Sequence, residues 1–331
     1  MIKAIHFKNF KALRDTTLPL GRLTLLVGPN GSGKSTALEA LLLRKLTLGD
    51  GAFSAGLVLN GQSEVSIEVE WGGPHAGRRS RKWLRYRRSN EFGHFRDPGN
   101  SQPSAELDRL LDSVRVYSLD ATVLAAPVQL TPRIELAPKG TGFAGVLDRL
   151  RDGHPERWEA LNEEFGRWLP EFDRILFDTP TPGNRAIELR TRAGQHAIPA
   201  SDISQGTLLA LALLTLAYLP DPPPILGLEE PGRGIHPRLL RDVRDAMYRL
   251  AYPENFGEQR EPVQVVATTH SPYLLDLFKD HPDEIVIANK AEGKVTFTRL
   301  SDLPNVDEIL ADAALGEVWY SGILGGVPAD K

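Results

Sequence analysis

Short apolar runs and a helical pattern follow one another at the start of the chain. Residues 3–7 and 23–27 predict two strands, and apolar residues then recur with helical spacing from Ala37 to about Leu46. Between residues 57 and 88 apolar and polar side chains alternate singly, with a Gly-Gly-Pro turn inside the segment. We therefore expect an antiparallel meander beside a buried strand and helix.

The middle third of the chain carries mainly helical patterns. They cover residues 105–111, 144–151 and 155–169, with a strand at 114–119 and a hairpin around the turn at 193–195. The third helix has large apolar side chains at helical spacing, namely Trp158, Leu161, Phe165 and Trp168. Such a stripe is typical of a core, and an aromatic binding site is the alternative. We expect an inserted, mainly helical lobe here.

Strands and helices alternate in the last third, which is typical of a parallel sheet covered by helices. The predicted elements are helices at 208–218, 237–251 and 273–278 and strands at 225–228 and 263–269. Ser204 is the expected N-cap of the first of these helices, and a final strand pair and a structural segment at 315–319 close the chain. The pattern divides one α/β core into an N-terminal part (1–113) and a C-terminal part (201–331), separated by the inserted lobe (114–200).

The composition narrows the class of protein without naming it. With 331 residues the chain can build a large core, and its formal charge of -4 means that any nucleic acid must be met by a local patch. The chain has no cysteine, which excludes disulfides, cysteine zinc sites and thiol catalysis. No signal-peptide pattern opens it, and its longest apolar run, 208–219, is too short for a bilayer. We expect a cytoplasmic protein that acts on no membrane.

A glycine-rich segment joins the strand at 23–27 to the helix after it. Residues 28–36 read Gly-Pro-Asn-Gly-Ser-Gly-Lys-Ser-Thr and fit the phosphate-binding template Gly, four residues, Gly-Lys-Ser/Thr. Backbone amides of such a loop surround phosphate oxygens, Lys34 reaches the terminal phosphates, and Ser35 offers a hydroxyl to magnesium. The expected nucleotide contacts are Asn30, Gly31, Ser32, Gly33, Lys34, Ser35 and Thr36. The segment predicts a nucleoside triphosphate site.

Polar residues follow two further buried strands. Glu229 and Glu230 end the strand at 225–228, and His270 ends the strand at 263–269. Because parallel strands bring their carboxyl ends to one edge of a sheet, these side chains are expected to meet the phosphate loop. We assign Glu229 to the magnesium ion, Glu230 to the attacking water as general base, and His270 to the terminal phosphate.

A basic stretch lies in the second strand of the meander. Its charged residues are Arg78, Arg79, Arg81, Lys82, Arg85, Arg87 and Arg88, interleaved with Trp83 and Tyr86. Basic residues with aromatics can grip a nucleic-acid backbone and stack on bases. The alternative is an edge strand protected by charge, neutralised by pairing with the acidic strand at 64–70.

The order of these motifs resembles that of the ABC-type ATPases. Residues 28–36 resemble Walker A, and Ser204-Gln205-Gly206-Thr207 resembles the signature motif. Glu229-Glu230-Pro231, with 235–237, resembles Walker B and the D-loop, and 268–272 resembles the switch-histidine segment. The match is closest to the soluble branch with RecF-like, SMC-like and OLD-like members. The signature departs from the usual Ser-Gly-Gly-Gln or Ser-Asp-Gly-Thr, and Glu229 stands where many relatives carry Asp.

This resemblance implies a P-loop NTPase of the α/β class, with a mixed sheet flanked by helices, an antiparallel β subdomain and an inserted helical lobe. It implies a head-to-tail homodimer with ATP between the protomers, in which Ser204 and Gly206 face the nucleotide at the other protomer's Lys34. Gln129 is the candidate Q-loop glutamine by position alone, and a plain loop residue is the alternative. No long coiled-coil pattern like that of SMC-like proteins is visible in the sequence, and with 61 residues after His270 we expect no OLD-type nuclease domain in it.

We therefore expect a magnesium-dependent ATPase whose ATP-driven dimerisation acts on a partner protein, such as a nuclease, or on DNA, in repair or phage defence. Two other functions remain open. One is a nucleotide-gated binding module in which slow hydrolysis is a timer. The other is the ATPase subunit of a transporter, which the long insertion between Lys34 and Ser204 disfavours.

Overall fold

A computed structural model of the chain describes residues 1–42, 64–86, 92–95, 105–304, 306, 308, 310 and 314–324. The chain forms two compact units. Unit 1 contains residues 1–116, 223–229 and 261–331, and unit 2 contains residues 117–222 and 230–260. These two units are a different division of the chain from the predicted three parts with boundaries at 113 and 200, which stay a prediction.

Unit 1 contains two sheets. The first is antiparallel, in the order β2 (Leu13–Pro19), β1 (Ile2–Phe10), β4 (Glu64–Trp71), β5 (Arg79–Tyr86) and β6 (Phe92–Phe95). The second runs β15 (Lys294–Arg299), β14 (Ile285–Ala291), β3 (Leu23–Val27), β13 (Gln264–Thr269), β12 (Ile225–Glu229) and β7 (Arg115–Tyr117). Its strands β14, β3, β13 and β12 pair in parallel and β15 is antiparallel to β14, so the sheet is mixed.

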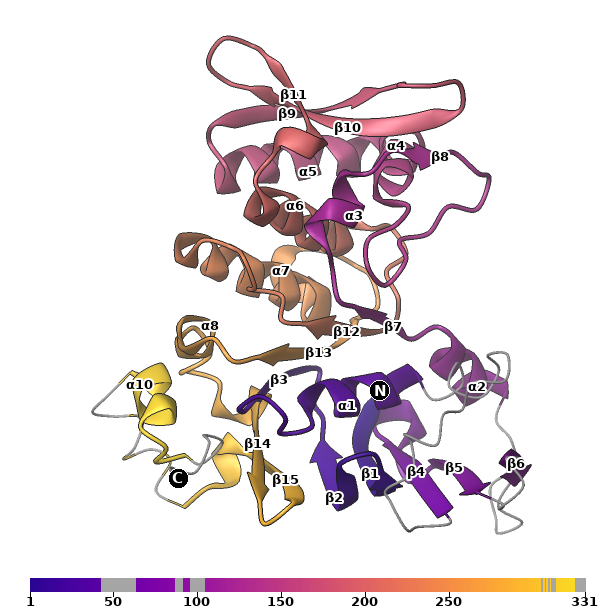
Figure 1. Cartoon of the computed structure of the whole chain (residues 1–331), viewed down its shortest axis with the longest axis vertical. Coiled ribbons are helices and arrows are strands. Elements are labelled where there is room, and N and C mark those ends of the chain that lie inside the picture. Colours follow the sequence, from indigo (N-terminus) through magenta and orange to yellow (C-terminus); the bar gives the residue numbers. More distant parts are fainter. Residues whose placement is uncertain are drawn as a thin grey trace. The chain divides into compact units, whose positions relative to one another are not determined.

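The two sheets of unit 1 share one hydrophobic core. Phe7 and Trp71 from the antiparallel sheet, and Leu26 and Val266 from the mixed sheet, are buried together in it. Four helices complete the described part of this unit: α1 (Lys34–Glu39), α2 (Ala105–Asp112), α8 (Pro272–Asp276) and α10 (Leu315–Tyr320). Figure 1 shows β3, β13 and β12 side by side, with α1 following β3.

Unit 2 packs helices against a small antiparallel sheet. The helices are α3 (Ala121–Ala125), α4 (Phe143–Gly153), α5 (Pro155–Trp168), α6 (Gln205–Tyr218) and α7 (Leu240–Ala251). The strands are β8 (Val128–Gln129), β9 (Phe172–Asp178), β10 (Asn184–Thr191) and β11 (Ala197–Pro199), and β10 pairs with all three others. Helix α6 is apolar along its length and buried from Thr207 to Tyr218 apart from Leu209.

The structure confirms the α/β fold class and refines several elements. The aromatic stripe of α5 is buried, with Trp158 4% and Phe165 0% exposed, so it belongs to the core. Helix α1 begins at Lys34, three residues earlier than predicted, and the end of the predicted helix near Leu46 lies outside the described residues. The middle third contains a sheet whose strand β9 the sequence pattern does not predict.

Candidate functional site

The phosphate loop connects the fully buried strand β3 to helix α1. Gly33, the residue before α1, has a φ of 91°, in the left-handed region that favours glycine. The Lys34 ammonium donates hydrogen bonds to the carbonyl oxygens of Gly28 at 2.6 Å and Pro29 at 3.0 Å. The lysine therefore folds back over its own loop, which holds its charge next to the loop backbone.

Ser32 lies inside the same loop and is 1% exposed. Its backbone N–H donates to the Pro29 carbonyl at 3.2 Å, but its hydroxyl oxygen is buried with no hydrogen-bond partner among the described residues. A buried polar atom without a partner is uncommon because it loses its contact with water and gains nothing in return. The loop thus has a polar group available for a ligand, which fits a phosphate oxygen.

The strand register brings the predicted residues to one edge of the mixed sheet. Val27 of β3 is opposite Thr269 of β13, and Thr268 of β13 is opposite Glu229 of β12. The phosphate loop and His270 each follow these paired positions directly, and Glu229 is itself the last residue of β12. Three neighbouring parallel strands therefore end together, as expected for a ligand site in such a sheet.

A direct contact joins the two predicted magnesium ligands. The Ser35 hydroxyl, in the first turn of α1, donates a hydrogen bond to Oε1 of Glu229 at 2.5 Å. Both side chains present oxygen atoms, the ligand type that magnesium prefers. The residues present therefore fit a magnesium ion.

Glu230 directly follows β12 and is the first residue of the second segment of unit 2. Its φ is 49°, an uncommon conformation for a residue with a β-carbon, and its carbonyl accepts a hydrogen bond from the Arg233 N–H at 2.9 Å. The backbone thus turns sharply between the two glutamates. Such strain is often found at functional sites.

The signature residues lie at the start of α6 in unit 2. The Ser204 hydroxyl accepts the Thr207 N–H at 3.2 Å and lies 2.8 Å from the Thr207 hydroxyl, so Ser204 is the N-cap, as predicted. A β-carbon at Gly206 would lie 2.6 Å from the carbonyl oxygen of Gly234, so only glycine fits. The helix start is therefore packed tightly against the segment that follows Glu229-Glu230-Pro231.

The structure places Gln129 in the two-residue strand β8 of unit 2. Gln129 is exposed and pairs with Asn184 of β10. Its assignment as the Q-loop glutamine stays a prediction.

The basic strand β5 pairs with the acidic strand β4, as predicted. Glu70 is opposite Arg79 and Glu68 is opposite Arg81, and the Arg79 guanidinium lies 2.8 Å from Oε1 of Glu68. Strand β5 lies between β4 and β6, so the interpretation of β5 as an edge strand is wrong. The side chains from Arg81 to Tyr86 and the whole of Arg87 and Arg88 lie outside the described part of the chain.

Side-chain hydrogen bonds that were not predicted from the sequence hold the segment after β13. The buried Thr269 hydroxyl accepts the Ser271 N–H at 3.0 Å, and the Ser271 hydroxyl accepts the Leu274 N–H at 3.4 Å as the N-cap of α8. The pattern Thr-x-Ser-Pro before a helix is a capping signal that could have indicated this arrangement.

A glycine-rich loop after a buried parallel strand, with its serine hydrogen-bonded to a carboxylate at the end of another parallel strand of the same sheet, is the arrangement of a P-loop ATPase. A family model described as "AAA domain, putative AbiEii toxin, Type IV TA system" matches residues 76–276, and one described as "AAA ATPase domain" matches residues 1–65. The chain belongs to this AAA domain family and is an ATPase.

Individual proteins are similar to a segment of the chain or to its fold. A segment of 50 residues, 15% of the chain, is 54% identical to an OLD nuclease from Thermus scotoductus and spans only 9% of that protein. The Smc head domain from Pyrococcus furiosus, solved with an extended coiled coil and bound to the C-terminal domain of ScpA, has a TM-score of 0.60. It is 15% identical, with 90% of this chain and 95% of that chain covered. The SMC head domain from Thermotoga maritima has a TM-score of 0.49 at 17% identity, over 90% of this chain and 98% of its own.

Among the described residues, no helix is both long and apolar enough to cross a membrane.

Proposed function

We propose that the chain hydrolyses ATP with magnesium and that ATP joins two copies head to tail. The observation that carries the proposal is the hydrogen bond between Ser35 and Glu229, at 2.5 Å. It ties the hydroxyl of the phosphate loop to a carboxylate on another strand end, so two oxygen ligands already meet beside Lys34. When bound, a magnesium ion there would neutralise charge on the terminal phosphates.

The chain's own residues account for the remaining requirements of the reaction. The amides of residues 30–36 and the Ser32 hydroxyl bind phosphate oxygens, and Lys34 turns from the Gly28 and Pro29 carbonyls to the terminal phosphates. The Glu230 carboxylate accepts the proton of the attacking water, and His270 holds the terminal phosphate from the end of β13. Hydrolysis then needs only positioned groups and no covalent intermediate on the protein.

The proposed dimer gives the signature residues a role. In the proposed dimer Ser204 and Gly206 contribute a hydroxyl and a backbone amide to the nucleotide bound at the other copy's phosphate loop. The exposure of Ser204 at the start of α6 supports this proposal, because an exposed helix start can receive a phosphate. ATP would thus be the link that holds the copies together.

The variant Glu230→Gln tests both the role of Glu230 as general base and the ATP-dependent dimer. Without the carboxylate as base, turnover should fall by about 10²-fold or more, while ATP binding persists because the phosphate loop is intact. With ATP and magnesium the variant should therefore accumulate as a dimer in light scattering. Wild-type turnover would contradict the role of Glu230, and a monomer under these conditions would contradict the dimer.

We further propose that the ATPase acts with DNA or a nuclease in defence or repair. The OLD nuclease match and the toxin named in the family description support this role, as does the basic strand β5. Charge reversal at Arg85, Arg87 and Arg88 should remove salt-dependent DNA binding, measured by fluorescence anisotropy at several salt concentrations. Absence of salt-dependent binding by the wild type would remove DNA as the partner.

A further inference from the structure

The last described helix, α10, is docked on the segment that carries His270. Only His270 and Ser271 separate the end of β13 at Thr269 from the start of α8 at Pro272. With so short a connection, any displacement of α8 must change the direction in which His270 leaves the strand. The position of α8 is therefore a determinant of the position of His270.

Two contacts fix α10 on α8. A β-carbon at Gly316 would lie 2.7 Å from both the Cβ and the carbonyl oxygen of Pro272, so the backbone of α10 approaches the start of α8 as closely as glycine allows. At the other end of α8, Oδ1 of Asp276 accepts the Gly316 N–H at 2.6 Å. Gly316 is buried and thus meets both ends of α8.

A further contact that holds this segment comes from β13. The Thr269 hydroxyl, 1% exposed, fixes the Ser271 N–H, so the start of α8 is held from the strand side as well. His270 itself is exposed. The backbone on either side sets the direction in which this side chain leaves the chain.

From this geometry we infer that Gly316 and Asp276 are positioning residues for His270, so that α10 sets the rate of hydrolysis without touching the nucleotide. The inference rests on the role proposed for His270. A methyl group at Gly316 displaces Pro272, and a displacement on the order of 1 Å at a reacting group can cost about 10²-fold in rate. ATP binding is unaffected because the phosphate loop follows β3, not β13.

The test compares His270→Ala, Gly316→Ala and the double variant in steady-state ATP hydrolysis. Gly316→Ala should lower kcat about tenfold or more with KM for ATP within about twofold. The double variant should be no slower than His270→Ala, because Gly316 acts only through that histidine. Asp276→Ala should behave like Gly316→Ala, whereas Asp276→Asn, which keeps the accepting oxygen, should restore kcat.

The outcomes distinguish the role of His270 in hydrolysis from the positioning role of Gly316 and Asp276. If His270→Ala hydrolyses ATP at the wild-type rate, the role proposed for His270 is wrong. The positioning role is wrong if His270→Ala is slow while Gly316→Ala has wild-type kcat. It is also wrong if the fold loss of kcat in the double variant is the product of the losses in the two single variants. If circular dichroism shows that Gly316→Ala does not fold, Asp276→Ala and Asp276→Asn replace it, each measured alone and combined with His270→Ala. Equal kcat values for Asp276→Ala and Asp276→Asn would overturn the positioning role.

Discussion

Ser35 and Glu229 are the residues on which the metal requirement should depend. The hydrogen bond between them shows that the two side chains reach the same point from α1 and from β12. We expect Glu229→Gln to raise the magnesium concentration for half-maximal turnover by about tenfold or more, because an amide is a weaker ligand for a hard cation than a carboxylate.

The measurement is ATP turnover as a function of magnesium at saturating ATP. Glu156→Gln is the matched control, since this glutamate is exposed at the start of α5 and should leave the magnesium dependence unchanged. Equal magnesium requirements in wild type and Glu229→Gln would remove Glu229 from the metal site.

The structure predicts how much stability a substitution of Gly206 would cost. A methyl group there would lie 2.6 Å from the Gly234 carbonyl oxygen, which belongs to the backbone and cannot rotate away. We expect Gly206→Ala to lower the free energy of unfolding by about 1–3 kcal/mol, as measured by urea denaturation. Gly153→Ala is the control, because a β-carbon there meets nothing within 4 Å, and its unfolding free energy should not fall.

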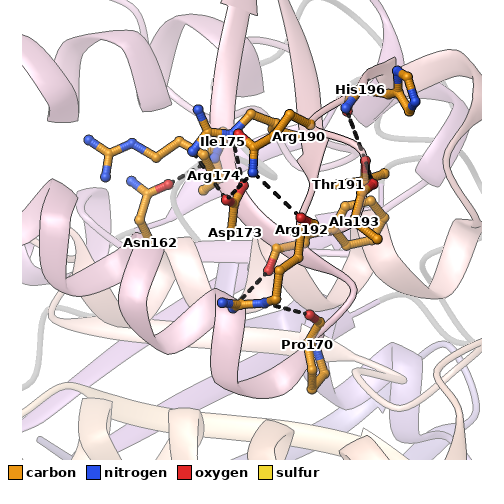
Figure 2. Close-up of polar contacts among 12 residues, drawn as sticks. Asn162, Pro170, Asp173, Arg174, Ile175, Arg190, Thr191, Arg192, Ala193 and His196 are labelled. Atoms are coloured by element: carbon orange, nitrogen blue, oxygen red, sulfur yellow. Dashed lines mark hydrogen bonds and ion pairs between the residues drawn. The ribbon is translucent and has the colours of Figure 1, made fainter.

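At the scale of elements, the strands β9 and β10 are linked by a charged pair. Figure 2 shows the Asp173 carboxylate facing Arg190, whose Nε donates at 2.9 Å and whose second nitrogen donates at 3.2 Å. These hydrogen bonds hold the pKa of Asp173 below its ordinary value of 3.8 in the folded state. The charged form is thus favoured by folding, and its contribution to stability is present above pH 3.8 and is lost as the pH falls through the lower folded-state pKa.

We therefore expect Asp173→Asn to flatten the dependence of stability on pH in acid. The midpoint of urea unfolding should fall more steeply below about pH 4 in the wild type than in the variant. Asp178→Asn is the control, because this exposed carboxylate lies at the end of the same strand. Parallel pH profiles for wild type and Asp173→Asn would show that the pair is not formed in solution.

The elements around the phosphate loop could be predicted because each has a local signal. Strand β3 is apolar throughout, the glycine-rich loop has a fixed template, and Ser204 is a typical N-cap. Strand β9 has no such signal, because only Phe172 and Ile175 are buried and they are three residues apart, which breaks the alternation of a strand. Its stability comes from pairing with β10 and from Arg190, which no local pattern reveals.

The close backbone contacts of two glycines could not be predicted from the sequence. Gly206 against Gly234 and Gly316 against Pro272 join residues far apart in the chain, and a glycine in a helix gives no indication of what lies beside it. The hydrogen bond between Ser35 and Glu229 was easier to anticipate, because the carboxyl ends of parallel strands meet at one edge of a sheet and both residues lie there.

For the whole molecule, the predicted catalytic residues are divided between the two units. Unit 1 holds the phosphate loop, Glu229 and His270, and unit 2 holds the signature and begins one of its segments at Glu230. In a head-to-tail dimer each nucleotide needs Lys34 from one copy and Ser204 from the other. Two variants that are defective in different halves should then complement each other.

Lys34→Ala and Ser204→Asp are suited to this test. Lys34→Ala removes the phosphate-binding ammonium, whereas Ser204→Asp keeps the N-cap of α6, since aspartate caps about as well as serine, and places a negative charge against the phosphate. Each variant alone should be nearly inactive, with a far-ultraviolet circular dichroism spectrum like that of the wild type.

In an equimolar mixture about half of the dimers contain one copy of each variant, and one of the two sites in these dimers combines an intact Lys34 with an intact Ser204. Turnover should therefore recover to roughly a quarter of the wild-type rate, and it should rise with protein concentration as dimers form. A site completed within one chain can never be restored by mixing. No recovery at concentrations where Glu230→Gln is dimeric would thus place the complete site in a single copy and contradict the shared site.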